Sequence, residues 1–341
     1  MAFIAIIAIS FVSCSGDKNS LEDVPLQGAG ATFPAPLYQK WFKVYSESHD
    51  GVQVDYQSIG SGGGVKSVID KTVDFGASDA AMTPEDMAKV DVGVQLLPMT
   101  GGCIVLTYNL KGVTGLKLSR QAYAGIFLGK VKKWNDPLIA KDNAGVALPD
   151  QPINVVVRAD GSGTTFVFTR HLSAISPEFA KNPGINTLPN WPTGTRSKGN
   201  EGVTASIMMT PGAIGYVEYG YAKSQNLPMA ILENKSGSFV APSMASAQAA
   251  LASAQFPENL IAWVPDSDVK DAYPIATYTW LICYKQYKEK GKFQLLHDLL
   301  TYCVTDGQKE SEALGYIPLP QAVADRDKAA IQNITLAPNA T

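Results

Sequence analysis

Histidine is scarce in this chain of 341 residues, and its scarcity excludes several kinds of site. The three histidines are His49, His171 and His297, and no two of them stand at the spacing of metal ligands. His171 falls in an apolar helical segment, which favours a packed side chain over a general base. Neither Ser61 nor Ser162 has a glycine two residues upstream, so the nucleophile elbow of a hydrolase is absent at both. The sequence therefore predicts neither a metal centre nor an enzyme.

Cysteine is also rare, and its spacing excludes two further kinds of site. The chain has four cysteines, Cys14, Cys103, Cys283 and Cys303, and none of them forms a C-x-x-C pair. A zinc site or a thioredoxin-like redox motif would need such a pair. The last three lie in apolar runs, so we predict buried free thiols.

The chain has no excess of basic residues. It carries 28 Lys and Arg against 31 Asp and Glu, which gives a net charge of −3, and the basic residues are scattered. Nucleic-acid-binding proteins usually show a basic stripe, so we expect no nucleic-acid partner. An anion would have to be held by local dipoles and one or two placed cations. Nothing in the composition indicates a cofactor.

Residues 1–14 are almost wholly apolar but too short to span a bilayer as a helix, which takes about 20 residues. The pattern is typical of a secretory signal. Ending on Cys14, it resembles a bacterial lipoprotein signal, although no Lys or Arg precedes the apolar run. The alternative is a buried N-terminal strand. We predict a signal peptide over 1–13, a polar tether over 14–23, and acylation of Cys14 that anchors a periplasmic or cell-surface protein to a bacterial membrane.

Beyond the leader, strand-like and helix-like segments alternate, which predicts an α/β protein with largely parallel sheets. Strands are expected at 52–57, 73–78, 103–109, 153–158 and 273–284, and helices at 36–49, 65–70, 119–129, 164–172 and 293–305. No linker rich in Pro, Gly or Ser divides the chain. Two domains would therefore share more than one crossing strand.

Three glycine-rich loops, at 28–36, 60–64 and 158–165, stand near predicted helix starts and contain hydroxyl side chains. Early helix N–H groups lack partners within the helix, and the helix dipole places partial positive charge there. Glycine lets the backbone approach a bound oxyanion. Each loop alone fits a helix cap equally well. Three loops in one chain, with Arg158 beside the third, favour a shared anion site.

The second loop continues into GSGGGVKS (60–67), which resembles a nucleotide-binding loop. That motif requires glycine where this chain has Val65, before Lys66 and Ser67. The missing glycine and the secretory leader argue against an ATP site. We interpret Lys66 as a solvated residue and not as a ligand.

Asp79 directly follows a predicted strand, in a turn of small residues. Taken alone it could be a capping or turn aspartate. Near an anion, its carboxylate could accept a hydrogen bond only from a ligand that still carries a proton. Monohydrogen and dihydrogen phosphate carry one, whereas sulfate at neutral pH does not. A site with Arg, backbone N–H groups, hydroxyls and one carboxylate would therefore select phosphate over sulfate.

Six ordered segments closely resemble the extracytoplasmic phosphate-binding protein of bacterial high-affinity phosphate ABC transporters. They are GAGATFPAPLYQKW (28–41), GSGGGVK (60–66), VDFGASDA (73–80), RADGSGTTFVFT (158–169), KGNEGV (198–203) and PGAIGYVEY (211–219). The resemblance implies a periplasmic-binding-protein fold, with two lobes, each a mostly parallel sheet flanked by helices, joined by a two-strand hinge. Lobe I would comprise 24–103 and 278–341, and lobe II 104–277. Such a monomeric receptor would enclose inorganic phosphate between its lobes and deliver it to an ABC-type membrane permease.

The resemblance also implies roles for individual residues. Phosphate would be bound by Thr32, Phe33, Ser61, Asp79, Arg158, Ser162, Gly163 and Thr164, and Asp160 would flank the arginine. Asp79 would accept the phosphate proton, Arg158 would supply the cation, and the remaining residues would donate through backbone N–H groups and hydroxyls. Two departures from the family are minor: Val157 stands where a second Arg can occur, and Gly62 where a second Ser can occur.

Three alternatives remain at this stage. One is a receptor for another oxyanion, against which Asp79 argues. Another is a secreted phosphatase on the same scaffold, against which the few histidines argue. The last is a surface lipoprotein with an adhesive or signalling role, for which the sequence offers no discriminating feature.

Overall fold

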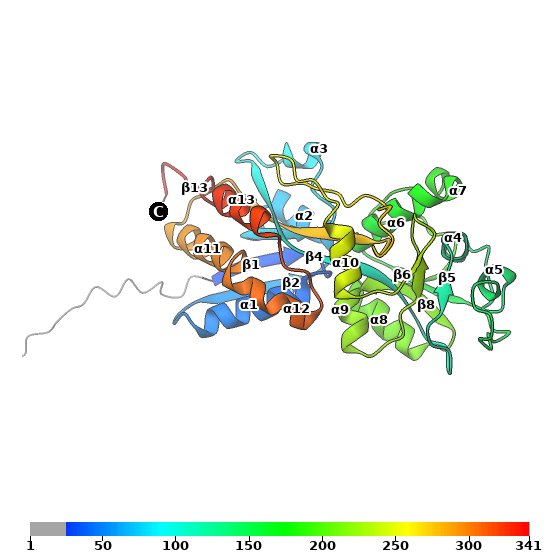
Figure 1. The fold of residues 1–341 in the computed structure, drawn as a ribbon. Helices are drawn as coiled ribbons and strands as arrows, with labels where there is room; N and C mark the ends of the chain where they lie inside the picture. Colours follow the sequence, from blue (N-terminus) through cyan, green and yellow to red (C-terminus); the bar gives the residue numbers. More distant parts are fainter. Residues whose placement is uncertain (1–24, 341) are drawn as a thin grey trace, which may run out of the picture.

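A computed structural model describes residues 25–340. The predicted signal peptide and the whole of the predicted tether, including Cys14, lie outside the described residues. Strands and helices alternate along the chain, as predicted (Figure 1). The strands are β1 (Pro25–Gly30), β2 (Gln53–Ser58), β3 (Phe75–Ser78), β4 (Val94–Tyr108), β5 (Lys117–Leu118), β6 (Asn154–Arg158), β7 (Thr195–Ser197), β8 (Ala213–Glu218), β9 (Ile231–Glu233), β10 (Phe239–Val240), β11 (Ala276–Tyr284), β12 (Gln286–Tyr287) and β13 (Thr335–Leu336).

The helices pack around the sheet (Figure 1). They are α1 (Ala35–Glu47), α2 (Ser61–Ile69), α3 (Pro84–Met87), α4 (Arg120–Phe127), α5 (Pro137–Ala140), α6 (Gly163–Ile175), α7 (Pro177–Lys181), α8 (Gly199–Met209), α9 (Tyr219–Ser224), α10 (Met244–Leu251), α11 (Lys290–Cys303), the 3-10 helix η1 (Asp306–Glu310), α12 (Ser311–Leu314) and α13 (Gln321–Ile331).

One eight-stranded sheet, in the order β2-β1-β3-β11-β4-β8-β6-β7, runs through the molecule. The outer strands on each side are parallel, whereas β11 pairs antiparallel with both β3 and β4, and β4 pairs antiparallel with β8. Helices α1, α2 and α11 to α13 gather around one end of this sheet, and α4 to α8 around the other (Figure 1). The result is two lobes: lobe I around β1, β2 and β3, and lobe II around β6, β7 and β8.

Strand β4 joins the two lobes. Its first part, up to Cys103, pairs with β11, and its last part, from Ile104 onward, pairs with β8. The expected strand at 103–109 is therefore only the second half of a strand that begins at Val94. The register between β11 and β4 shifts by one residue: Thr279 pairs with Thr100, but Trp280 pairs with Pro98. Such a bulge lets a central strand accommodate a proline that cannot donate to its neighbour.

The three glycine-rich loops all begin at the carboxyl ends of parallel strands. The first begins within the last residues of β1, the second follows β2, and the third begins at the last residue of β6. Asp79 follows β3, which lies beside β1 in the same sheet. In open α/β sheets, ligands bind beyond the carboxyl ends of the strands. The topology therefore gathers the loops of lobe I along one edge, which faces the third loop across the boundary between the lobes.

Helix α2 begins at Ser61, earlier than the expected start at Val65. Glycine disfavours helices, but tertiary packing overrides this preference here. A Cβ at Gly64 would lie 2.6 Å from the carbonyl oxygen of Ala77 and 2.6 Å from the Cα of Gly30. Gly64 therefore lets α2 pack directly on the backbones of β1 and β3. Of the other glycines of GSGGGVKS, Gly60 and Gly62 lie close to Gly161 of the third loop instead.

The remaining cysteines are buried free thiols, as predicted. Cys103 lies on β4, Cys283 on β11 and Cys303 on α11, and none of them forms a disulfide. Burial raises the pKa of the Cys283 thiol to about 12. These side chains act as small apolar groups in the core.

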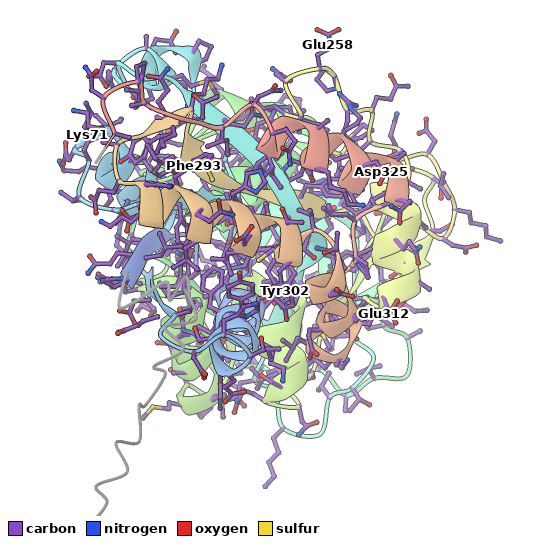
Figure 2. The ribbon with its side chains drawn as sticks, turned by 90° about the vertical axis from the view of Figure 1, so that its left-hand side faces the viewer. Lys71, Glu258, Phe293, Tyr302, Glu312 and Asp325 are labelled. Atoms are coloured by element: carbon purple, nitrogen blue, oxygen red, sulfur yellow. The ribbon has the colours of Figure 1, made fainter. Side chains whose placement is uncertain are left out.

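Helix α13 carries a buried carboxylate that should make stability depend on pH. Asp327 is fully buried, and neither carboxylate oxygen has a hydrogen-bond partner among residues 25–340. Burial raises the pKa of Asp327 from 3.8 to about 9. Asp325, labelled in Figure 2, lies on the exposed face of the same helix. The folded protein therefore holds a proton on Asp327 that the unfolded chain releases above its ordinary pKa.

Because the folded-state pKa is raised, the stability that Asp327 contributes is fully present below pH 3.8 and is lost as the pH rises towards about 9. Asp327→Asn removes the titration, so its free energy of unfolding should rise relative to wild type as the pH increases. We expect this gap to grow by about 3–4 kcal/mol between about pH 5 and about pH 8, since one proton contributes about 1.4 kcal/mol per pH unit. Urea unfolding at several pH values measures it, with Asp325→Asn as the exposed control. A gap that does not change with pH would contradict the prediction.

Candidate anion-binding site

The residues predicted to bind the ligand are gathered between the lobes and withdrawn from solvent. Thr32, Phe33, Ser61 and Asp79 come from lobe I, whereas Arg158, Asp160, Ser162, Gly163 and Thr164 come from lobe II. Gly163 is buried, and the exposed fractions of the others lie between 0% and 2%, apart from the Asp160 side chain at 12%. Polar groups buried to this degree normally need hydrogen-bonding partners.

Arg158 ends β6 and is held by a neighbouring carboxylate. Its Nε donates to Oδ1 of Asp160 at 2.9 Å, and its Nη2 donates to Oδ2 of the same side chain. Asp160 also accepts the backbone N–H of Gly199 at 3.0 Å. Burial acts to raise the pKa of Asp160, but the hydrogen bonds and the charge of Arg158 lower it overall. The bidentate pair fixes the guanidinium, whose Nη1 faces Thr164 Oγ1 at 3.5 Å.

Asp79 is a buried carboxylate that faces the third loop. Its Oδ1 accepts the hydroxyl of Thr279, on β11, at 2.8 Å, and its Oδ2 lies 3.5 Å from Thr164 Oγ1. Its backbone N–H donates to Ser61 Oγ at 3.2 Å. Burial raises the pKa of Asp79 to about 7, and the hydrogen bond from Thr279 and the charge of Arg158 limit the rise. The site therefore combines one fixed cation with one carboxylate that titrates near neutral pH.

The loops of the two lobes touch one another. The backbone N–H of Gly62 donates to the carbonyl of Gly161 at 2.9 Å. At the rim, Ser58 Oγ donates to Oε1 of Glu201 at 2.8 Å. These contacts join the end of β2 and the start of α2 to the third loop and to α8. The residues of the site are thus enclosed from both sides.

Gly163 is one of the tightest points of this contact. A Cβ there would lie 2.5 Å from Ser61 Oγ and 2.7 Å from both Cβ and Oδ2 of Asp79. We expect Gly163→Ala to force the two lobes apart and to weaken ligand binding by about 1–3 kcal/mol, the usual cost of overpacking. Isothermal titration measures the affinity. Gly202→Ala on α8, whose Cβ would meet Ser197 only at 3.7 Å, is the control. Equal affinities of the two variants would contradict the prediction.

Helix capping explains only one of the three loops. Ser162 Oγ accepts the backbone N–H of Thr165 at 3.0 Å and caps α6. Helices α1 and α2 begin after Pro34 and Gly60, without a side-chain cap. The hydroxyls of Thr32 and Ser61 are therefore free of the capping role that the sequence alone could not exclude.

Several residues around the site were not predicted from the sequence. Tyr221 donates its hydroxyl to the carbonyl of Thr32 at 2.6 Å, and Tyr316 donates to the carbonyl of Phe33 at 2.7 Å. Thr279 and Asn200 also contact predicted residues directly. Asn200 lies inside the KGNEGV segment, but nothing in the local sequence distinguishes its amide from that of a surface asparagine.

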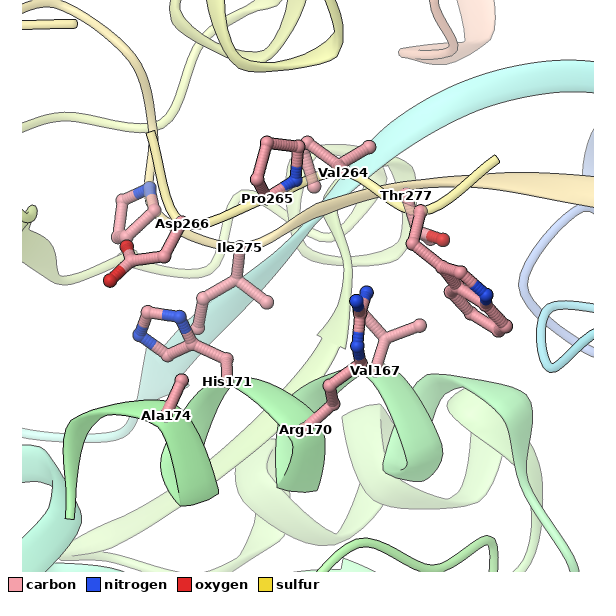
Figure 3. Close-up of a pocket in the computed structure, with 12 residues that line it drawn as sticks. Val167, Arg170, His171, Ala174, Val264, Pro265, Asp266, Ile275 and Thr277 are labelled. Carbon is pink, nitrogen blue, oxygen red and sulfur yellow. The ribbon is translucent and has the colours of Figure 1, made fainter. Parts of the chain in front are cut away.

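Two residues that the sequence analysis set aside lie away from the site, as predicted. Lys66 is exposed and pairs with Asp70 one helical turn later. His171 is buried on α6, with Nε2 2.8 Å from the hydroxyl of Tyr123, and burial lowers its pKa to about 4. Figure 3 shows His171 beside Arg170 in a small separate cavity of about 110 Å³. A histidine with so low a pKa is a weak proton acceptor and is unsuited to act as a general base near pH 7.

Comparison with known proteins places the chain in a family. Residues 16–306 match the PBP superfamily domain. Over 309 residues the chain is 42% identical to the phosphate-binding protein PstS of Pasteurella multocida (strain Pm70), and the match covers 89% of each protein. The chain belongs to the PstS family of phosphate-binding proteins. A second member, from Haemophilus influenzae (strain ATCC 51907 / DSM 11121 / KW20 / Rd), is 40% identical over 308 residues, covering 89% of this chain and 91% of the relative.

The architecture agrees with this membership. A solved periplasmic phosphate-binding protein, PfluDING bound with phosphate, superimposes with a TM-score of 0.74, covering 90% of this chain and 93% of the other. The two sequences are 21% identical, so this likeness shows the fold alone. The two-lobed periplasmic-binding-protein fold that the PstS resemblance implied is thereby confirmed. Within residues 25–340, no helix is both long and apolar enough to cross a membrane, and no cluster of His, Cys, Asp and Glu could hold a metal ion.

Proposed function

We propose that this protein binds free inorganic phosphate with high affinity between its lobes. The anion would be held by Thr32, Phe33, Ser61, Asp79, Arg158, Ser162, Gly163 and Thr164, with Asp160 fixing the arginine. The observation that carries the proposal is that one buried site combines groups that favour an anion with a carboxylate that favours a ligand carrying a proton. Arg158 and the start of α6 require an anion, whereas Asp79 requires an anion that still carries a proton. Phosphate meets both demands near neutral pH.

The protein would act as a receptor and not as an enzyme. Its relatives are named as phosphate-binding proteins, and among residues 25–340 neither the Ser61 nor the Ser162 hydroxyl is hydrogen-bonded to a histidine or a carboxylate. We propose that it delivers phosphate to an ABC-type permease as a monomer in the periplasm or at the cell surface, tethered through acylated Cys14. The lobes would comprise 24–103 with 278–341, and 104–277. The change of partner of β4 between Cys103 and Ile104 supports this division.

A calorimetric titration tests the proposal most directly. The purified mature chain, stripped of phosphate, is titrated separately with phosphate, sulfate and a phosphate monoester. We expect tight binding of one phosphate per chain, much weaker binding of sulfate, and neither tight binding nor hydrolysis of the monoester. Tighter binding of sulfate than of phosphate would overturn the proposal in favour of another oxyanion. Hydrolysis of the ester would overturn it in favour of a phosphatase.

A further inference from the structure

Asn200 occupies the junction between the two halves of the site. It is the second residue of α8 in lobe II and is fully buried. Its Nδ2 lies 2.7 Å from Oγ1 of Thr32, which belongs to lobe I, and 3.3 Å from Oγ1 of Thr164, which belongs to lobe II. Its backbone N–H donates to the same Thr32 oxygen at 3.1 Å. One side chain thus reaches hydroxyls from two of the three loops.

The orientation of the Asn200 amide is determined by its other partner. The backbone N–H of Glu218, at the end of β8, lies 2.9 Å from the oxygen Oδ1 of Asn200. A backbone N–H can only donate, so the amide atom that faces it must be the oxygen. The NH₂ group must then face the two threonine hydroxyls. The hydrogen-bond network leaves no alternative flip of the amide.

This orientation decides what the Thr32 hydroxyl can do. A hydroxyl accepts through two lone pairs and donates one proton. Thr32 Oγ1 accepts two hydrogen bonds, both from Asn200, so its proton remains for donation. Among residues 25–340, no protein acceptor receives that proton. Thr164 Oγ1 also accepts from Asn200 and from Arg158, but its own proton is donated to Oδ2 of Asp79 at 3.5 Å.

We propose that Asn200 is a positioning residue for anion binding. It fixes the hydroxyl of Thr32 as a donor towards the ligand and holds Thr164 in place, and its bonds to Thr32 connect lobe II to lobe I. This inference rests on the proposed function, because it assumes that the ligand lies between these loops. It adds a residue that makes no contact with the ligand and acts only through the threonines. Since the bonds to Thr32 cross the lobe boundary, they exist only while the lobes are together.

A double-mutant cycle separates this role from a merely structural one. In the wild-type background, Asn200→Ala should weaken phosphate binding about ten- to hundredfold, mainly through a faster dissociation rate. In a Thr32→Val background the same change should cost much less, because the hydroxyl to be oriented is already gone. Asn143→Ala is the matched control, since Asn143 is a buried asparagine of lobe II that bonds the backbone of Lys117 and Ile139. It should leave phosphate affinity unchanged.

A second variant keeps the inference testable if Asn200→Ala does not fold. Asn200→Asp keeps an oxygen for the Glu218 N–H but loses the NH₂ donors. The negative charge that this variant introduces is present in both the wild-type and the Thr32→Val backgrounds, so its effect on affinity cancels when the two are compared. The remaining difference measures the coupling between residue 200 and the Thr32 hydroxyl. Equal losses of affinity with and without the Thr32 hydroxyl, for both Asn200 variants, would overturn the inference. If wild-type protein itself fails to bind phosphate, the proposed function falls instead, so the two failures are distinguishable.

Discussion

Replacing Arg158 with alanine should weaken phosphate binding by about two to four orders of magnitude. Arg158 is 1% exposed and supplies the positive charge that faces Thr164 and Asp79 between the lobes. Removing one partner of a buried ionic contact typically costs about 3–5 kcal/mol, because the other charge is left uncompensated. Here two charges would lose their partner, the bound anion and the carboxylate of Asp160. Isothermal titration with phosphate, at fixed pH and salt, measures the loss.

The control for Arg158→Ala is Arg196→Ala. Arg196 lies on β7, in register with Val157 beside the same strand, but it is exposed. Removing an exposed charge should change phosphate affinity little, because solvent screens it. Arg158→Ala combined with Asp160→Ala removes the buried pair together, and it should restore thermal stability without restoring affinity. Retention of near wild-type affinity by Arg158→Ala would show that the anion binds elsewhere.

Much of the fold could be predicted because the local pattern and the final structure agree. The strand expected at 153–158 is β6, Asn154–Arg158, and the helix expected at 36–49 is α1, Ala35–Glu47. On α1, the apolar side chains of Leu37, Trp41 and Tyr45 repeat every four residues and are buried together. Where one face of a helix or strand packs on the core, the repeat of apolar residues in the sequence predicts that element.

The predicted element boundaries that were wrong depend on contacts between residues far apart in the sequence. Pro98 and the glycines at 101 and 102 precede the strand predicted at 103–109, yet they lie within the single strand β4. That strand is continuous because it must cross from one lobe to the other, and its partner β11 slips in register opposite Pro98. Likewise, α2 starts within a run of glycines because Gly64 packs against two strands. Local propensity carries no information about such contacts.

The residues of the site also fall into two groups: those that the sequence indicated and those that it did not. Thr32, Ser61, Asp79 and Arg158 could be proposed from the sequence because their loops have a recognisable chemistry and resemble those of a known family. The direct contacts between them, such as that of the Asp79 N–H with Ser61 Oγ, could not be predicted, since they come from segments far apart in the chain. Thr279 and Asn200 carried no signal, because their importance depends on what stands opposite them in the folded protein.

Asp79→Asn should relax the exclusion of sulfate. Thr279 donates to Oδ1 of residue 79, so in the variant the oxygen of the amide should remain there. The NH₂ group would then take the place of Oδ2, where a donor would face the anion instead of an acceptor. A proton-free anion such as sulfate would gain a partner, and phosphate would lose one. We expect sulfate to bind about ten- to hundredfold tighter relative to phosphate, equivalent to about 1–3 kcal/mol.

The pH dependence of selectivity separates this explanation from a general loosening of the site. Since the pKa of Asp79 is raised to about 7, its carboxyl is protonated below that pH and can then donate to sulfate. Wild-type protein should therefore exclude sulfate less strongly at about pH 5.5 than at about pH 8.5. Asp79→Asn cannot titrate, so its exclusion of sulfate should be weak at both. Competition titrations at the two pH values measure this, with Asp327→Asn, the same change at a distant buried site, as the control. If Asp79→Asn discriminates like wild type, the carboxylate is not the acceptor that selects phosphate, and selectivity must come from the donors alone.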